Sequence, residues 1–335
     1  MSSSNYSENA CGVIDVNNSP TYLFNNLTCN GNLAFFLKGC KLISFQEAAL
    51  SGSIPADGKS SSLKDMIDGT QVQWCLIGSR YHLVCTSYSG VQVYGSDGKT
   101  VEYVFPLKSS DIDFGSEPEG SYFTRGICAV NATNQICVGA STGHIFIFNV
   151  TDEDEIDLKN TKACHKYAVS AMCNVENILA TGDDYGNIIL WDVFENYDEL
   201  CRFQGSSHPC TGLIGQNGYV IGTYTSGHIR VFSIRNEQLF IEIAGHSRPI
   251  TGIDIHPAHD SFVTVGEDSI LNVWQFPKQD DEEDSNTGGD IHKARSLKVI
   301  FSTSSPNALF TGVQYAKNGT NTIFTSVYDQ NEIRK

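Results

Sequence analysis

The 335-residue sequence lacks the features that mark several common protein classes. No apolar run approaches the roughly 20 residues that a membrane-spanning helix needs. The first residues are polar, without the basic and apolar regions of a secretory signal peptide. With 22 basic against 38 acidic residues, the net charge is −16, which disfavours broad contact with nucleic-acid phosphates. We expect a cytoplasmic protein, with a nuclear location left open, that is not secreted, binds no nucleic acid and has no transmembrane segment.

Closely spaced cysteine pairs are absent as well. None of the 11 cysteines forms the Cys-x-x-Cys spacing that is usual in zinc sites. Several lie inside apolar runs, among them Cys75 and Cys128, where a free cysteine packs as a small hydrophobic residue. The sequence therefore predicts reduced thiols and neither a metal ion nor a cofactor.

A repeat dominates what the sequence does contain. A turn-forming residue is followed by alternating apolar residues and a closing aromatic, and this pattern is typical of β-strands. The closing aromatics are 49, 54, 43, 41 and 42 residues apart, and they are Phe45, Tyr94, Phe148, Trp191, Phe232 and Trp274. A period of about 40–45 residues is typical of four-stranded propeller blades. The two longer intervals contain polar insertions at 51–69 and 106–121, and a weak copy near the end brings the count to seven units.

The last unit holds only three strand patterns before the sequence ends. They lie near Phe310–Tyr315, 322–326 and 331–335, while residues 11–16 form an unassigned strand pattern at the other end. Pairing the two ends would close the ring and remove open sheet edges. We predict an all-β fold, a single seven-bladed propeller of four-stranded antiparallel blades over residues 11–335. Residues 1–10 are expected to be disordered, and residues 278–295 to form a flexible acidic loop.

The sixth unit contains a set of residues with a distinctive spacing, Gly245-His246, Thr264, Asp268 and Trp274. By these residues the chain resembles the WD-repeat propeller family. In that family a loop His, a strand Ser/Thr, a turn Asp and a strand Trp form a buried hydrogen-bonded network. A satisfied buried polar network fixes one blade geometry.

Two further units match this pattern in part. The fourth has Trp191-Asp192 with His165 and Thr181, and we expect its acid at Asp184, one position away from the usual spacing. The fifth keeps His208 but has Gly222, Ser226 and Phe232 at the other three positions. We assign His165, His208 and His246 to structural networks rather than to catalysis.

The resemblance implies a non-enzymatic scaffold that binds partner proteins or peptides through its faces and loops. Four residues match rim positions of the face that often takes peptides in this family, namely Arg125, Tyr167, Arg248 and Glu267. The main alternative is a central-channel reader of a short basic or modified peptide. Two alternatives are less favoured. A ubiquitin-ligase substrate adaptor usually carries Arg two residues after the Trp-Asp dipeptide, where this chain has Phe194. A propeller enzyme would need clustered polar residues or a metal at the channel mouth, and no residue spacing points there. Self-association is left open.

Two acidic runs supply most of the negative charge, and both fall between a third and a fourth strand. Their residues are Asp152, Glu153, Asp154 and Glu155 in one and Asp280, Asp281, Glu282, Glu283 and Asp284 in the other. We favour their role as solvated loops that aid solubility. The alternative is an electrostatic docking site for a basic segment, with strong salt dependence.

Two short motifs match enzyme patterns only in outline. Gly139-x-Ser141-x-Gly143 fits the nucleophile elbow of hydrolases, but that motif needs a helix after the turn, and here a strand pattern follows. Gly98-Lys99-Thr100 resembles the end of a phosphate loop, yet Val93 stands where its first Gly is required. We therefore predict no catalytic residues.

Overall fold

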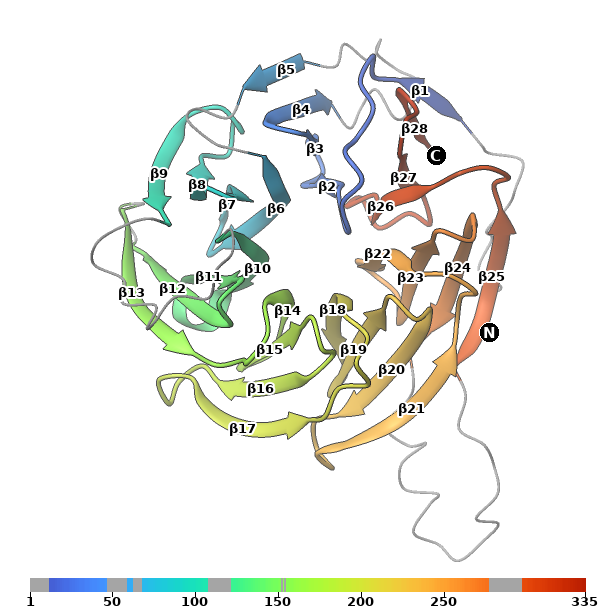
Figure 1. Cartoon of the computed structure of the whole chain (residues 1–335). Coiled ribbons are helices and arrows are strands. Elements are labelled where there is room, and N and C mark those ends of the chain that lie inside the picture. Colours follow the sequence, from blue (N-terminus) through green and yellow to red (C-terminus); the bar gives the residue numbers. More distant parts are fainter. Residues whose placement is uncertain are drawn as a thin grey trace, which may run out of the picture.

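The protein is a closed ring of seven antiparallel sheets (Figure 1). The computed structural model describes residues 12–46, 59–62, 68–107, 122–151, 153, 155–276 and 297–335. Each sheet has four strands, so the predicted seven-bladed propeller is confirmed. The predicted disordered residues 1–10 and acidic loop 278–295 lie outside the described residues.

The blades are numbered in chain order, and their strands are given from the innermost to the outermost. Blade 1 contains β2 (Thr28–Cys29), β3 (Leu33–Lys38), β4 (Lys41–Gln46) and β5 (Lys59–Ser62). Blade 2 contains β6 (Gly69–Ile77), β7 (Arg80–Ser87), β8 (Gly90–Tyr94) and β9 (Val101–Pro106). Blade 3 contains β10 (Thr124–Val130), β11 (Gln135–Ala140), β12 (His144–Val150) and β13 (Ile156–Ala163), with a 3-10 turn at Asn131–Thr133. Blade 4 contains β14 (Val169–Val175), β15 (Ile178–Asp183), β16 (Ile188–Asp192) and β17 (Asp198–Phe203).

The remaining blades follow the same order. Blade 5 contains β18 (Cys210–Gln216), β19 (Tyr219–Tyr224), β20 (His228–Ser233) and β21 (Gln238–Ala244). Blade 6 contains β22 (Ile250–Ile255), β23 (Ser261–Gly266), β24 (Ile270–Gln275) and β25 (Lys298–Ser304). Blade 7 contains β26 (Phe310–Tyr315), β27 (Ile323–Val327), β28 (Glu332–Arg334) and β1 (Val13–Asp15).

Blade 7 is completed by the two ends of the chain. β1 pairs antiparallel with β28, with Ile14 opposite Ile333. Val16, directly after β1, is fully buried, and its N–H donates to the carbonyl of Asn331 at 2.8 Å. The predicted closure by an N-terminal strand is therefore confirmed, and it covers an edge that β28 would otherwise expose.

The hydrophobic core is divided among the contacts between neighbouring blades. Side chains alternate between the two faces of a strand, so each blade presents one apolar face to either neighbour. The buried residues of the described chain form seven clusters, each shared by two adjacent blades. One cluster joins blade 2 to blade 3. In it, the ring centroid of Phe105 lies 5.0 Å from that of Phe146 and 5.3 Å from that of Phe148. Closure of the ring is needed for blades 1 and 7 to share such a cluster.

Inner strands contact one another closely around the central channel. Blades 5, 6 and 7 each have a Thr-Gly dipeptide where the inner strand is bulged, at Thr211-Gly212, Thr251-Gly252 and Thr311-Gly312. The threonines are buried. A Cβ on Gly312 would lie 2.8 Å from the backbone nitrogen of Leu27, so only glycine allows this approach. This signal was readable in the sequence and was missed.

Thiols contribute to the core as small apolar groups. Ten cysteines lie in the described part of the chain, all are free, and most are buried. Burial raises the pKa of the Cys173 thiol to about 12, which keeps it neutral and unreactive at neutral pH.

Truncation of the N-terminus tests the closure. A chain that begins at residue 17 loses β1 and Val16, whereas one that begins at residue 11 keeps both. A buried aliphatic side chain contributes about 1.5–3 kcal/mol to stability. We therefore expect the free energy of unfolding of the shorter chain to be lower than that of the longer one by at least about 2 kcal/mol. Urea unfolding measures this, with the chain 11–335 as the control that should match the full sequence. Equal unfolding free energies for the two truncations would contradict the role of β1.

Candidate functional site

Blade 6 holds a buried chain of hydrogen bonds between four side chains. Nδ1 of His246 lies 2.9 Å from a carboxylate oxygen of Asp268, and Nε2 lies 2.8 Å from Oγ1 of Thr264. Nε1–H of Trp274 donates to the same Oγ1 at 2.8 Å. A carboxylate only accepts, so the N–H at Nδ1 of His246 donates to Asp268, and an indole only donates, so Oγ1 of Thr264 accepts from Trp274.

Blade 4 builds the same network with a different acid. Nδ1 of His165 lies 2.9 Å from Asp183, Nε2 lies 2.8 Å from Thr181, and Trp191 donates to Thr181 at 2.9 Å. The expectation that Asp184 supplies the acid is therefore wrong. Asp184 lies on the surface and pairs with Arg125.

The position of Asp183 explains how the network tolerates this change. Asp183 occupies the strand position that is Gly266 in blade 6, since both stand two residues after the network threonine. A Cβ built on Gly266 would lie 2.9 Å from Oδ1 of Asp268. Two positions in the sequence can thus deliver a carboxylate to the same point in space.

Both network acids are stabilised as carboxylates. Burial alone would raise the pKa of Asp183, but hydrogen bonds from His165 and Asn187 outweigh it and hold that pKa below its usual range. Asp268 has a lowered pKa as well, because hydrogen bonds from His246 and the Ser247 N–H outweigh burial.

Blade 5 has no such network, and the expected role of His208 is wrong. His208 is exposed on the surface. The fully buried Tyr224 stands at the position of Asp183, and its hydroxyl lies 3.0 Å from where a Cβ on Gly222 would be. The Tyr224 ring therefore fills the network space, and Arg230 lies over it at 5.0 Å.

The ring has two distinct faces. We call the face with the connections into each inner strand the crossover face, and it also carries the turns between second and third strands. The opposite face, which carries the other two sets of turns, is the turn face. The four predicted rim residues all lie in connections or turns of the crossover face, or at the start of an inner strand there.

Three of the predicted rim residues are already engaged within the chain. Arg125 pairs with Asp184 at 2.6 Å, Tyr167 stacks on Tyr185, and Glu267 accepts a hydrogen bond from Tyr22. Arg248 is exposed.

A strip of aromatic side chains crosses blades 2, 3 and 4 on the crossover face. Ring centroids lie 4.8 Å apart for Tyr167 and Tyr185, with an angle of 11° between the rings, and 5.5 Å apart for Tyr88 and Phe123. Arg125 joins the two pairs, since its guanidinium lies 5.5 Å from the Phe123 ring and bonds the residue before Tyr185. We call Tyr88, Phe123, Tyr167 and Tyr185 the aromatic strip.

The N-terminal segment, residues 17–27, covers another part of this face. It runs from β1 toward the centre of the ring (Figure 1), where Asn25 reaches the inner strands of blades 5 and 6. Asn25 donates through its backbone N–H to Thr251 O and through Nδ2 to Thr211 O, both at 2.8 Å, and accepts from Ile253 N at 3.1 Å. Sequence reasoning missed this role.

Neighbouring residues fix the segment further. Asn26 donates to Thr311 O at 2.7 Å and accepts from the N–H of Leu37 at 2.7 Å, which ties blade 7 to blade 1. The Tyr22 ring packs edge-on against Tyr328 with centroids 5.9 Å apart. The crossover-face side of the channel is therefore narrowed by the chain itself.

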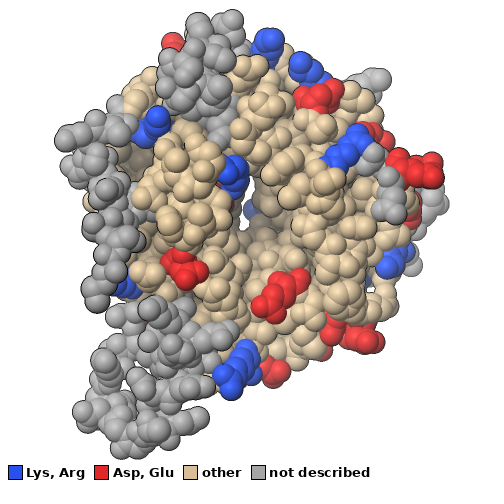
Figure 2. Space-filling view, turned by 180° about the vertical axis from the view of Figure 1, so that it is seen from behind, with Lys and Arg blue, Asp and Glu red and all other residues tan. Residues whose placement is uncertain are grey.

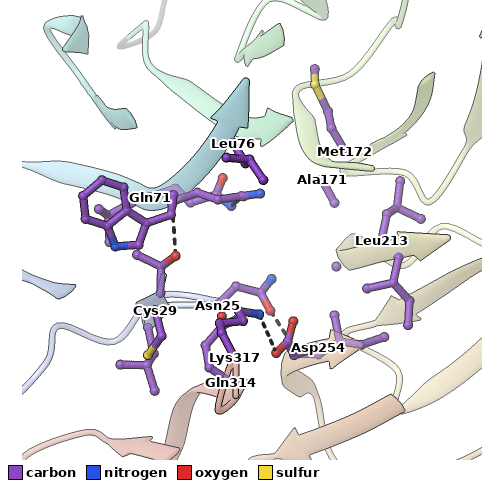
Figure 3. A pocket seen from close by; sticks show the side chains of 18 of the residues that line it. Asn25, Cys29, Gln71, Leu76, Ala171, Met172, Leu213, Asp254, Gln314 and Lys317 are labelled. Carbon is purple, nitrogen blue, oxygen red and sulfur yellow. Dashed lines mark hydrogen bonds and ion pairs between the residues drawn. The ribbon is translucent and has the colours of Figure 1, made fainter. Parts of the chain in front are cut away.

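The channel contains a cavity of about 230 Å³ between the inner strands. Figure 3 shows the apolar side chains of Leu76, Met172 and Leu213 on one side of the cavity, with Gln71 beside Leu76, and the polar side chains of Asp254, Gln314 and Lys317 on the other side. On the polar wall, Oδ2 of Asp254 accepts from Tyr315 N at 2.7 Å and lies 3.5 Å from Nζ of Lys317. The face shown in Figure 2 is hollowed at its centre, and its charged side chains are spread around the hollow rather than gathered in one patch.

Comparison with known proteins identifies the family. The profile of the WDR54 family matches residues 56–335. The chain belongs to the WDR54 family. WD repeat-containing protein 54 of Mus musculus is 28% identical over 215 residues, and that of Homo sapiens is 27% identical over 219. Each match covers 62% of this chain and 63% of the relative, so it spans less than two thirds of the relatives' length.

Solved structures show the fold alone, because identity is low. A chain of the crystal structure of the mitotic checkpoint complex has a TM-score of 0.71 at 11% identity, covering 96% of this chain and 92% of that one. Chaetomium thermophilum Raptor gives a TM-score of 0.69 at 11% identity, with 96% of this chain and 28% of that one. As WD-repeat propellers generally act as protein-interaction scaffolds, membership of the WDR54 family supports that broad class.

Other predicted features of this WDR54 family member fall partly outside the described residues. Of the acidic runs, only Glu153 and Glu155 are described. Ser141 lies in the turn between β11 and β12, and its hydroxyl accepts a hydrogen bond from Phe123 N at 3.1 Å. The strand β12, not a helix, therefore follows the Gly139-x-Ser141-x-Gly143 motif. Within the described ranges, no group of three or more His, Cys, Asp or Glu residues could hold a metal. No helix there is long and apolar enough to cross a membrane.

Asn substitutions at the two neighbouring aspartates test the network assignment. Asp183→Asn weakens a buried charged hydrogen bond, and we expect a loss of about 1–3 kcal/mol in unfolding free energy. The matched variant Asp184→Asn removes a partly exposed ion pair with Arg125 and should cost at most about 1 kcal/mol. Urea unfolding at neutral pH compares them, and a larger loss for Asp184→Asn would contradict the assignment.

The lowered pKa of Asp183 also predicts a pH dependence of the stability. A lowered folded-state pKa gives stability that is present above the ordinary Asp pKa of about 3.9 and is lost as pH falls through the folded value. Asp183→Asn should therefore lose less stability than the unaltered chain between about pH 4 and 2. Parallel acid-unfolding profiles for the two proteins would be the opposite result.

Proposed function

We propose that this protein is a non-enzymatic interaction scaffold whose aromatic strip on blades 2–4 docks partner proteins. The exposed stacked pair of Tyr167 and Tyr185 is the single observation that carries the proposal. Their exposed fractions are 36% and 40%, and that of Tyr88 is 41%. Tyrosine is enriched among the residues that dominate binding energy at interfaces, because it offers a large contact area at low cost in conformational entropy.

The strip is preorganised before any partner binds. Stacking of the two rings and the Arg125–Asp184 ion pair fix side chains from blades 3 and 4 against each other. Preorganised side chains lose little freedom on binding, so more of the contact energy remains for affinity. The loops that carry the strip residues are held by the rigid sheets of blades 2–4, so the spacing between these loops stays constant.

The N-terminal segment favours blades 2–4 over the rest of the crossover face. Tyr22 donates a hydrogen bond to Glu267 of blade 6 and packs against Tyr328 of blade 7. Asn25 narrows the channel beside blades 5 and 6. A partner on that half would have to compete with the chain's own residues. Among the described residues, the tyrosines of the strip on blades 2–4 stay exposed and are not contacted by the N-terminal segment.

A channel reader of basic or modified peptides has weaker support. Such a reader needs several aromatic rings and carboxylates around the bound side chain. In the described part of the channel lining, the aromatic residues are Trp74 and Tyr81, both from blade 2, and the carboxylate is Asp254. Trp74 is buried, with its indole N–H bonded to Leu33 O at 3.2 Å.

Docking of a basic segment on the acidic runs is the second candidate. It predicts partners that are lost at high salt and on removal of residues 279–291. Glu153 and Glu155, the two described members, belong to the connection between β12 and β13 on the turn face. The same experiment can distinguish the two docking surfaces.

An affinity comparison with three variants tests the proposal. The full chain, the double variant Tyr167→Ala/Tyr185→Ala, and a chain lacking 279–291 are used to capture proteins from native lysate, quantified by mass spectrometry. Phe194→Ala is the matched control, because Phe194 is 61% exposed and lies on the turn face of the same blade. We expect the captured amount of specific partners to fall about tenfold or more for the tyrosine variant and to stay unchanged for the other two variants.

Circular dichroism melting should show the same midpoint for Tyr167→Ala/Tyr185→Ala and Phe194→Ala, which excludes unfolding as the cause. Partners retained by the tyrosine variant but lost without 279–291 would assign function to the acidic loop instead. Partners lost only with Phe194→Ala would place the site on the turn face.

A further inference from the structure

The channel cavity has a mixed lining. Apolar side chains of Leu76, Met172, Leu213 and Ile253, from blades 2, 4, 5 and 6, form one apolar surface. Polar side chains line the rest of the cavity, and Asp254, Gln314 and Lys317 of blades 6 and 7 lie on one wall (Figure 3). A few convergent polar groups beside an apolar surface are a usual feature of small-ligand sites.

The polar wall carries one charge of each sign. Burial lowers the pKa of Lys317, but the Asp254 carboxylate outweighs burial and leaves the pKa above its usual value, so the side chain is a cation. The Lys317 and Asp254 side chains are only 30% and 15% exposed. At 3.5 Å their contact is long for a charge-assisted hydrogen bond, so each group retains capacity for a further partner.

Gln314 adds an unused polar group beside this pair. Within the described residues its amide has no hydrogen-bond partner, although it lines the cavity on β26. An amide offers both donors and an acceptor, so it can complete the contacts of a carboxylate or an ammonium group.

The volume of the cavity suits a small molecule. About 230 Å³ lies just below the ~300–1,000 Å³ of sites for drug-sized ligands. A single amino acid is of a size that such a cavity can hold.

The charges select among small molecules. A ligand with one charge would be attracted by one member of the Asp254–Lys317 pair and repelled by the other. A ligand with adjacent ammonium and carboxylate groups satisfies both, and an apolar side chain suits the wall of Met172 and Leu213. We infer that the channel is a binding site for a free apolar α-amino acid, with its ammonium on Asp254, its carboxylate on Lys317 and its side chain on the apolar wall.

Titration calorimetry of the full, unaltered chain tests this with defined probes. L-Leucine should bind saturably at one site. Leucinamide and 3-methylbutylamine lack the carboxylate, 4-methylpentanoate lacks the ammonium, and L-glutamate lacks the apolar side chain. Each should bind about tenfold more weakly or worse, since a charged hydrogen bond or a buried aliphatic group is lost.

Two variants locate the site. Asp254→Asn keeps an acceptor for Tyr315 N, and Lys317→Gln keeps much of the aliphatic chain, yet each should weaken L-leucine binding about tenfold or more. Lys162→Gln is the matched control, because Lys162 forms an ion pair with Asp198 at 3.6 Å and does not line the channel. This variant should bind L-leucine as the unaltered chain does.

Three results would overturn the inference. They are no saturable L-leucine binding up to millimolar concentration, leucinamide binding as tightly as leucine, or unchanged binding in both channel variants. The ligand comparison uses the unaltered chain, so it remains decisive if a variant fails to fold. None of these outcomes bears on the aromatic strip, which lies on the crossover face.

Discussion

Closure of the ring by β1 and the N-terminal segment is the constraint on which the rest of the structure depends. Every blade buries its apolar faces against two neighbours, and blades 1 and 7 gain their shared core only when the chain ends meet. β1 and the segment act at two distances from the centre. β1 completes the outer edge of blade 7, and Asn25 and Asn26 bond the inner strands of blades 5, 6 and 7.

This closure also shapes the surfaces available for binding. The same residues that bond the inner strands narrow the channel on the crossover face, and Tyr22 occupies Glu267 and Tyr328. Among the described residues, the tyrosines of the aromatic strip across blades 2–4 stay exposed, and a cavity of mixed polar and apolar lining lies inside the channel. These are two separate surfaces of different chemistry, and the proposed protein docking and the inferred amino-acid site rest on one each.

Periodic features of the fold could be predicted from the sequence, because a strand pattern is local and repeats. Inner strands such as β22 and β26 fall where the alternation places them, and the unpaired last unit predicts the closing strand. Contacts between distant residues could not be predicted in this way. Asn25 and Thr211 are 186 positions apart, and no period relates them.

The network residues show a similar limit. Spacing alone identifies His246 and Asp268, since they follow the family pattern, but it selects Asp184 over Asp183. The geometry tolerates a carboxylate from either of two positions, and a linear spacing rule cannot express that. In blade 5, replacement of the network by Tyr224 and Arg230 becomes visible only once the buried ring is seen in place.

Hydrogen exchange of the Asn25→Ala variant tests the central claim most directly. The Asn25 side chain contributes two hydrogen bonds to inner strands, one to Thr211 O of blade 5 and one from Ile253 N–H of blade 6. Loss of the side chain should therefore speed amide exchange in β18 and β22, far away in sequence, and leave β6 and β10 unchanged. Faster exchange confined to residues 17–38, or spread equally over all seven blades, would contradict closure of the ring through this residue.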